Sequence, residues 1–97
     1  MGKLYITEYS EAAIMPGGVP VGAEPGTEQT PVTYTTTTQS SAFGAKTKFV
    51  RIHTDSICSI LFGADPTATT SSKRLAADQT EYFAVTPGHK VAAVANT

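Results

Sequence analysis

Two pairs of short, strand-like segments dominate the second half of this 97-residue chain. Residues 47–53 and 57–62 form the first pair, and residues 81–85 and 90–94 form the second. These segments are rich in β-branched, aromatic and other apolar residues, and only a few turn residues separate the members of each pair. Strand-like segments joined by short turns predict antiparallel hairpins. We therefore expect a small all-β domain built around two hairpins, with the segment 57–62, apolar on both faces, in a central position.

Further strands are expected on either side of these pairs. Residues 3–9 alternate with a period of two, which is typical of a half-buried strand. Residues 32–39 are dense in threonine and favour another strand. We interpret residues 73–77 as a short strand rather than a helical turn, and no segment has the period of 3.6 that predicts a helix. Residues 86–89 suit a type II turn, because Pro87 stands second and Gly88 supplies a positive φ at the third position.

The alternation also predicts a hydrophobic core. Its members are the apolar residues expected on the inner faces of the strands. They are Leu4, Ile6, Val50, Ile52, Ile60, Phe62, Phe83, Val85, Val91 and Val94.

Residues 15–31 differ from the rest of the chain. They contain four prolines and four glycines and have no periodicity. Proline has no backbone N–H to donate to a strand ladder, so this stretch is expected to be a loop or an extended arm. Ordering a residue costs about 1 to 2 kcal/mol, and the arm has few apolar side chains to offset that cost against its own domain. We expect it to dock on a partner through its apolar residues, Met15, Pro16, Val19, Pro20 and Val21.

The length predicts one domain, residues 1–97, folded as a small antiparallel β-sandwich or barrel-like module with a Pro/Gly-rich arm. Cys58 is the only cysteine, so the domain has no internal disulfide, and one cysteine with two histidines is too few for an ordinary zinc site. We expect neither metal nor cofactor. Because so small a core needs support, we expect a homo-oligomer or a multi-copy subunit.

The charge composition argues against several classes of partner. The formal charge is −1 and the isoelectric point is near 6.0, which gives no reason to expect binding to nucleic acid or to an anionic membrane. Charged residues make up 15% of the chain, below the usual quarter, and hydroxyl residues replace them, as suits a surface that lies against protein. No apolar run approaches the length of a membrane span, and no export signal is recognised. An unpaired cysteine in an apolar strand fits a reducing cytoplasm.

Residues that carry reactive chemistry are few. His53, Asp55, Ser56 and Cys58 lie close in the sequence, but alternation sends the first two to one side of the strand and the last two to the other. We interpret them as polar turn residues and a core thiol. The G-x-S-x-G motif of hydrolases is absent, and we expect no enzymatic activity.

Two surface features allow more than one interpretation. Lys73 and Arg74, the one pair of adjacent basic residues, form either a solvated strand edge or an ion-pair contact with an acidic partner. The four tyrosines fit core and interface roles, and they also fit a platform for carbohydrate.

Four segments, 51–55 (RIHTD), 60–68 (ILFGADPTA), 73–77 (KRLAA) and 81–92 (EYFAVTPGHKVA), cover most of the second half. Together they resemble a pattern found in small virion proteins of tailed bacteriophages. The resemblance implies a non-enzymatic head decoration or cement protein that is made in the host cytoplasm and binds the major capsid protein or another virion protein. Two alternatives remain open: a tail, adaptor or fibre-associated virion component, and a carbohydrate-binding module.

Overall fold

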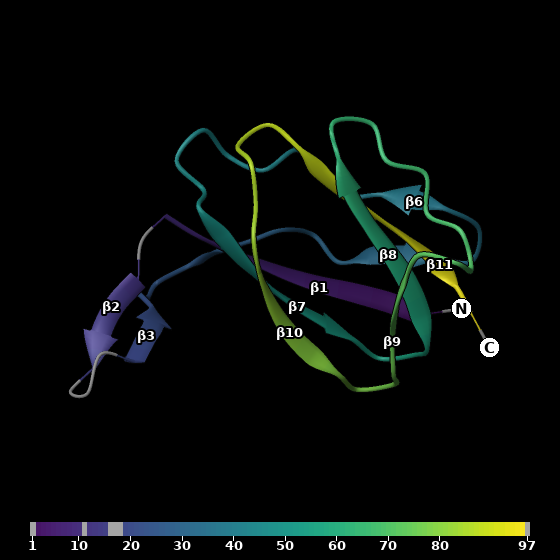
Figure 1. Cartoon of the computed structure of the whole chain (residues 1–97), viewed down its shortest axis with the longest axis horizontal. Coiled ribbons are helices and arrows are strands. Elements are labelled where there is room, and N and C mark those ends of the chain that lie inside the picture. The colour runs from purple at the N-terminus through teal and green to yellow at the C-terminus, as the bar shows by residue number, and fades with distance from the viewer. Residues whose placement is uncertain (1, 11, 16–18, 97) are drawn as a thin grey trace.

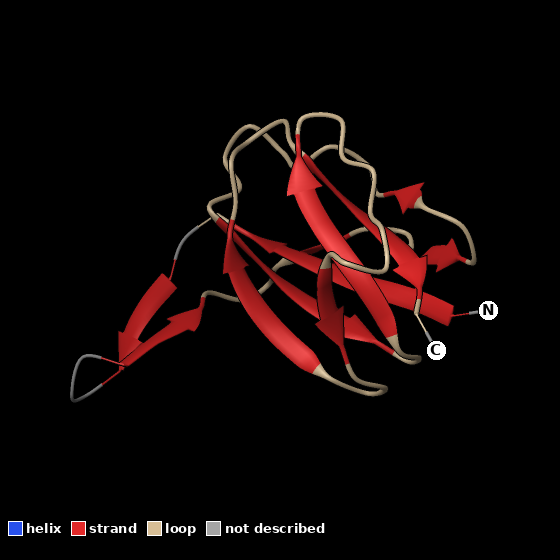
Figure 2. Cartoon of the chain, turned by 45° about the vertical axis from the view of Figure 1, so that its right-hand side comes forward, coloured by secondary structure: helices blue, strands red, loops and turns tan. Residues whose placement is uncertain are grey.

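A computed structural model describes residues 2–10, 12–15 and 19–96. All regular secondary structure in these ranges is β-strand, so the expected all-β fold is confirmed (Figure 2). Two antiparallel sheets pack face to face as a small β-sandwich (Figure 1). No helix in the described part of the chain is long and apolar enough to cross a membrane.

The larger sheet, hereafter sheet I, is built around β1. Its strands follow the order β10 (Thr80–Ala84), β7 (Phe49–Thr54), β1 (Gly2–Tyr9) and β4 (Thr27–Glu28), and β5 (Val32–Tyr34) also pairs with β1. The smaller sheet, sheet II, follows the order β6 (Thr38–Gln39), β11 (Lys90–Ala95), β8 (Cys58–Gly63) and β9 (Lys73–Leu75). A separate hairpin consists of β2 (Ala12–Met15) and β3 (Val19–Gly22).

The strand segments were predicted well, but both predicted hairpins are wrong. β7 pairs with β1 and β10 in sheet I, whereas β8 pairs with β11 and β9 in sheet II. Likewise β10 belongs to sheet I and β11 to sheet II. Each short connection therefore crosses from one sheet to the other, and the members of each pair face each other across the core.

Buried polar groups fix the first crossing. The hydroxyl groups of Tyr34 and Thr54 lie 2.8 Å apart, and they lie 2.9 Å and 2.7 Å, respectively, from the carbonyl oxygen of Ser56. The backbone N–H of Asp55 donates to the carbonyl oxygen of Lys3 on β1. Thr54 and Cys58 are both fully buried, so the chain leaves the core from one sheet and returns to it from the other.

The second crossing contains the predicted turn. The N–H of His89 donates to the carbonyl oxygen of Thr86 at 3.1 Å, and Gly88 has a φ of +85°. Phe43 bonds to both sides of this turn, since its carbonyl oxygen accepts from the N–H of Gly88 and its own N–H donates to the carbonyl oxygen of His89. The tight turn is thus confirmed, although it joins two sheets rather than two neighbouring strands.

Two further segments differ from the prediction. The expected strand 32–39 divides into β5 in sheet I and β6 in sheet II, with a bend between them. The expected arm 15–31 is not uniformly irregular, because Met15 pairs with Val19 in the β2–β3 hairpin and Thr27–Glu28 pairs with β1. The hairpin projects away from the sandwich (Figure 1) and lies along the longest dimension of the molecule, 40 Å against 25 and 22 Å for the other two.

The core agrees largely with the prediction. Of the ten expected residues, Leu4, Ile6, Val50, Ile52, Ile60 and Val91 are buried, and Phe62, Phe83 and Val85 pack against them while partly exposed. The prediction that Val94 belongs to the core is wrong. Val94 lies three positions from Val91, so the two cannot share one face of a strand. The core members that the prediction left out are Val32, Tyr34, Phe43, Cys58, Leu75 and Ala93.

Candidate functional site

The outer face of sheet II is partly covered by the chain's own loop, residues 64–72. Ala92 points outward from β11, opposite Leu61 of β8, yet it is 0% exposed. Ser59, on the same face of β8, is also fully buried. Ala68, near the middle of the loop, is buried as well. The loop therefore acts as a third layer over part of this face, whereas Leu61 remains exposed beside Ala92.

Side-chain amides fasten the loop at both ends. Gln39 donates to the Asp65 carboxylate at 2.7 Å and to the carbonyl oxygen of Pro66 at 2.9 Å. Asn96 donates to the Ser59 hydroxyl at 2.7 Å and to the carbonyl oxygen of Thr70 at 3.2 Å. These bonds connect the loop to β6 and to the segment that follows β11, which in turn bonds to β8.

The outer face of sheet I is different, because large side chains on it remain in solvent. Tyr5 is 39% exposed and Tyr82 is 59% exposed. The strand register places Glu28, Thr7, Arg51 and Tyr82 in a row across four strands, and it places Tyr5 beside His53 in the next row. This surface, hereafter the open face, consists of Tyr5, Thr7, Glu28, Arg51, His53 and Tyr82.

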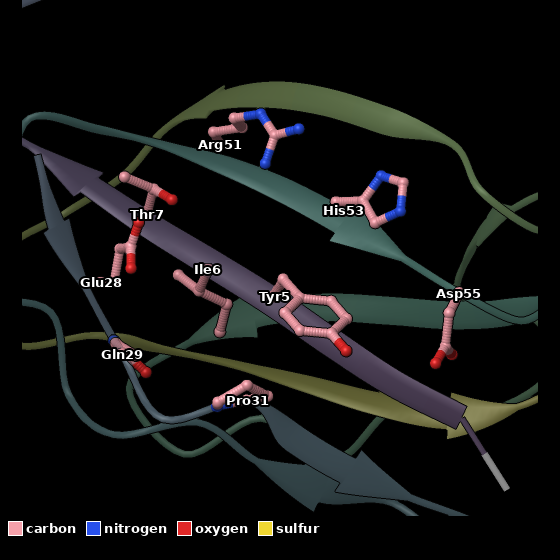
Figure 3. A pocket seen from close by; sticks show the side chains of 9 residues that line it. All are labelled: Tyr5, Ile6, Thr7, Glu28, Gln29, Pro31, Arg51, His53 and Asp55. Carbon is pink, nitrogen blue, oxygen red and sulfur yellow. The ribbon is translucent and has the colours of Figure 1, made fainter.

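A shallow, open depression lies in the middle of the open face (Figure 3). Arg51 and His53 lie on one side of the Tyr5 ring, and Gln29 and Pro31 lie on the other. The remaining lining residues are Ile6, Thr7, Glu28 and Asp55. Acidic, basic and aromatic groups thus meet in one surface hollow.

Contacts with neighbouring residues hold parts of the open face in place. The Nδ1 atom of His53 lies 2.8 Å from the Thr80 hydroxyl, and its Nε2 atom lies 3.9 Å from the Asp78 carboxylate. The Tyr5 and His53 ring centroids are 6.2 Å apart. Arg51 has no hydrogen bond or ion pair to another described side chain, so its guanidinium donors remain available. Tyrosine and arginine are, with tryptophan, the residue types enriched among the energetically dominant contacts of protein interfaces.

One end of the open face connects to the base of the hairpin. The Tyr9 hydroxyl donates to the Glu24 carboxylate at 2.7 Å, and the Tyr9 ring stacks on Phe49 with 5.0 Å between centroids. The bond to Glu24 and burial raise the pKa of Tyr9 to about 12. The chain that returns from the hairpin is therefore attached to the end of β1.

A second depression surrounds Glu8 at the end of β1. Its carboxylate accepts from the Thr47 hydroxyl at 2.6 Å, the Gly44 N–H at 2.8 Å and the Gln29 amide at 2.8 Å. Burial alone would raise the pKa of Glu8, but these three bonds outweigh burial and hold the pKa below its ordinary value. The Glu8 carboxylate thus joins β1 to the segment 44–47 and to Gln29, and its role is structural.

The residues predicted to contact a partner lie in two separate places. Met15, Val19, Pro20 and Val21 belong to the strands of the hairpin, and Pro16 lies outside the described residues. Lys73 and Arg74 lie on β9, away from the hairpin in both views (Figures 1 and 2).

Lys73 and Arg74 also point to opposite sides of β9. Lys73 pairs in register with Ile60 and extends toward the inner side, where its Nζ lies 5.1 Å from the centroid of the Phe83 ring. Arg74 pairs with Ser59 on the outer side. The two cations therefore do not form one patch.

Of the residues that resemble a catalytic set, His53 and Asp55 line the same depression, but Cys58 is not brought to them. Cys58 is fully buried, and its thiol donates to the Thr54 hydroxyl at 3.6 Å. His53 lies on the open face, and the Asp55 carboxylate accepts from the Lys3 N–H. Within residues 2–10, 12–15 and 19–96, no three His, Cys, Asp or Glu side chains are grouped so that they could hold a metal ion.

The sequence contained part of the signal for the open face. Arg51 and His53 alternate with the core residues Val50 and Ile52, which predicts that the two polar side chains share the opposite face of one strand. Glu28 carries no such signal, because its strand has only two residues and its place beside Thr7 depends on long-range pairing.

No protein-family model matches the chain, and comparisons with curated proteins and with solved structures give no significant match.

Proposed function

We propose that this protein is a non-enzymatic structural subunit of a tailed-phage virion, and that it binds the assembled capsid as a head decoration or cement protein. The virion assignment depends on the resemblance of the segments between residues 51 and 92 to small phage virion proteins. A neutral, hydroxyl-rich β-sandwich with a projecting hairpin is compatible with that role.

The observation that supports a docking function is the contrast between the two outer faces. The protein covers part of the outside of sheet II, including Ser59 and Ala92, with its own loop and leaves Leu61 exposed there. On sheet I two tyrosines, Tyr5 and Tyr82, remain exposed on one face. Arg51 lies between them with unused hydrogen-bond donors. Exposed tyrosine side chains on a rigid sheet lose little conformational entropy on binding, and arginine adds several hydrogen-bond donors, so the group favours contact with another protein.

The hairpin offers a second contact. Residues 12–15 and 19–22 carry no charged side chain, and β2 and β3 pair only with each other among the described strands. Burial against a neighbouring protein would stabilise this otherwise isolated two-stranded unit. The bond between Glu24 and Tyr9 attaches the returning chain to the end of β1, next to the open face.

A binding experiment with the native particle tests this function. One variant replaces residues 12–22 by a short glycine linker, and another carries both Tyr5→Ala and Arg51→Ala. Leu61→Ala is the matched control, because Leu61 is 42% exposed on sheet II. We expect both variants to fold but to co-sediment poorly with the particles, and we expect the control to bind like the parent.

Imaging of the particle decides the location. Cryo-EM of virions that contain the protein should place it on the head, with the open face toward the capsid. Density on the tail or fibres would support the alternative virion location, and normal binding of both variants would contradict the docking surfaces.

A carbohydrate-binding module is the second candidate, and the depression beside Tyr5 is the observation that favours it. An exposed aromatic ring next to Glu28, Gln29 and Asp55 offers a stacking surface together with groups that accept or donate hydrogen bonds. A glycan array with the parent and Tyr5→Ala separates the two functions. Saturable glycan binding that Tyr5→Ala abolishes would support the module.

A further inference from the structure

Strand β10 forms one edge of sheet I. It pairs with β7 on one side, and no other described strand pairs with its second side (Figure 1). Natural proteins usually protect such edges with proline, lysine or a bulge, because unpaired backbone groups accept a further strand. Thr80, Tyr82 and Ala84 are uncharged, and no proline interrupts the strand.

The hydrogen-bond pattern shows which residues face the unpaired side. Thr54 donates to the carbonyl oxygen of Gln79, and Val85 donates to the carbonyl oxygen of Lys48. In an antiparallel pair, alternate residues bond to the partner strand, so the odd-numbered residues of β10 bond to β7. The N–H and C=O groups of Thr80, Tyr82 and Ala84 therefore point away from the sheet.

This edge is complementary to itself. If two copies of β10 pair antiparallel about a two-fold axis at Tyr82, Thr80 lies opposite Ala84 of the second copy, and all outward backbone groups meet their counterparts. The two Tyr82 rings become direct cross-strand neighbours on the outer face. Tyr82, at 59% exposure, is the most exposed large hydrophobic residue of the sandwich strands in residues 2–10 and 23–96.

The charges beside the edge also complement those of a second copy. In the same register Glu81 lies opposite Phe83 of the second copy. Lys73 sits above the Phe83 ring, with its Nζ 5.1 Å from the centroid. The exposed Glu81 carboxylate accepts from the Gln79 amide of its own chain at 2.9 Å and keeps further acceptor positions. In this register each Glu81 approaches the Lys73 ammonium of the other copy, and the symmetry makes this contact twice.

We propose that two copies of this chain associate through their β10 edges, antiparallel about Tyr82, so that sheet I continues across both copies. The contact is stabilised by the backbone ladder, by the paired Tyr82 rings and by two Glu81–Lys73 ion pairs between copies. This inference does not depend on a capsid, so its failure would leave the proposed function intact.

The test is a charge exchange measured by sedimentation equilibrium on the full chain, from about 1 μM to about 1 mM. Glu81→Lys alone and Lys73→Glu alone each place like charges together at both contacts, and we expect each to raise the dimer dissociation constant about tenfold. The double variant restores opposite charges and should return the constant to within about threefold of the parent. Arg74→Glu, the same reversal on the outer side of β9, should have no effect.

A second variant tests the backbone ladder. Tyr82→Pro removes an N–H that points away from β7, so the fold of the monomer should survive, whereas association should be lost. Thermal unfolding of every variant establishes that it is folded. A parent that stays monomeric at 1 mM, single reversals that associate like the parent, or an equal loss in Arg74→Glu would each overturn the proposal.

Discussion

The two outer faces of the sandwich are built from strands with the same alternation of inward and outward side chains, but their outward side chains differ in exposure. On sheet II, the small outward residues Ser59 and Ala92 lie beneath the loop 64–72, and the larger Leu61 beside them is exposed. On sheet I, outward residues such as Tyr5, Arg51 and Tyr82 are large and remain in contact with solvent. The difference teaches that an outward position in a strand is not by itself a surface position, because a long connection adds a layer wherever it folds back.

The free energy of unfolding should differ most between the two faces when a charged side chain is introduced on each. Ala92→Lys places an ammonium beneath the loop, and we expect it to lower the free energy of unfolding by about 3 kcal/mol or more. Thr7→Lys makes the same kind of change on the open face beside Glu28, where water remains available. We expect its effect to stay within about 0.5 kcal/mol. Chemical denaturation of both variants measures the difference, and equal losses would contradict the covering role of the loop.

Glu8 should make the end of sheet I sensitive to acid. Because its folded pKa lies below its unfolded value, near 4.5, Glu8 stabilises the fold above that pH, and this contribution is lost as the pH falls through the folded pKa. Glu8→Gln keeps one acceptor oxygen but turns an N–H₂ group toward the Gln29 amide. We expect it to cost about 1 to 3 kcal/mol at neutral pH and to flatten the pH dependence below 4.5. Denaturant titrations from pH 3 to 7 measure both effects, and parallel profiles for parent and variant would rule out this role.

Loss of the Asn96 side chain should loosen the loop 64–72 on sheet II without unfolding the sandwich. Asn96→Ala removes the bonds to the buried Ser59 hydroxyl and to the Thr70 carbonyl oxygen. We expect a cost of about 1 kcal/mol and faster hydrogen exchange confined to residues 64–72. Hydrogen exchange read by mass spectrometry resolves the segment, and the open face serves as the internal reference. Unchanged exchange in the loop would mean that Gln39 and packing suffice to hold it.

The smallest effects on stability are expected for the open face itself. Tyr5→Ala and Arg51→Ala should each change the free energy of unfolding by no more than about 0.5 kcal/mol, because neither side chain belongs to the core. The same variants should weaken binding to the particle strongly. Melting curves measured beside co-sedimentation separate the two properties. A variant that loses stability and binding in the same proportion would count against a dedicated docking surface.

Much of the fold could be predicted because β-strands leave a local signal. The period of two placed Leu4, Ile6, Val50 and Ile52 in the core, and it placed Arg51 and His53 together on the opposite face. Gly88 marked the turn at residues 86–89, where its φ is +85°. The error at Val94 came from treating two apolar residues three positions apart as members of one face.

The local pattern could not predict to which sheet each strand belongs. A short connection between two strands fits a hairpin and a crossing between sheets equally well, since both reverse the chain within a few residues. At Thr54 the crossing depends on the buried hydroxyl of Tyr34, which is 20 positions away in the sequence. The candidate site has the same dependence, because Tyr5, Glu28 and Arg51 come from three strands that meet only through sheet pairing.

By itself the sequence determined most of the extended segments outside residues 12–28, which of their sides is apolar and where the chain turns sharply at residues 86–89. These properties depend on neighbours two to four positions apart. Only the tertiary structure decided which strands pair, that the loop 64–72 covers sheet II, and that Tyr5, Arg51 and Tyr82 stay exposed on sheet I. The reason is that strand pairing and loop coverage result from competition among contacts between distant segments. The free-energy differences among these contacts cannot be derived from any single segment of the chain.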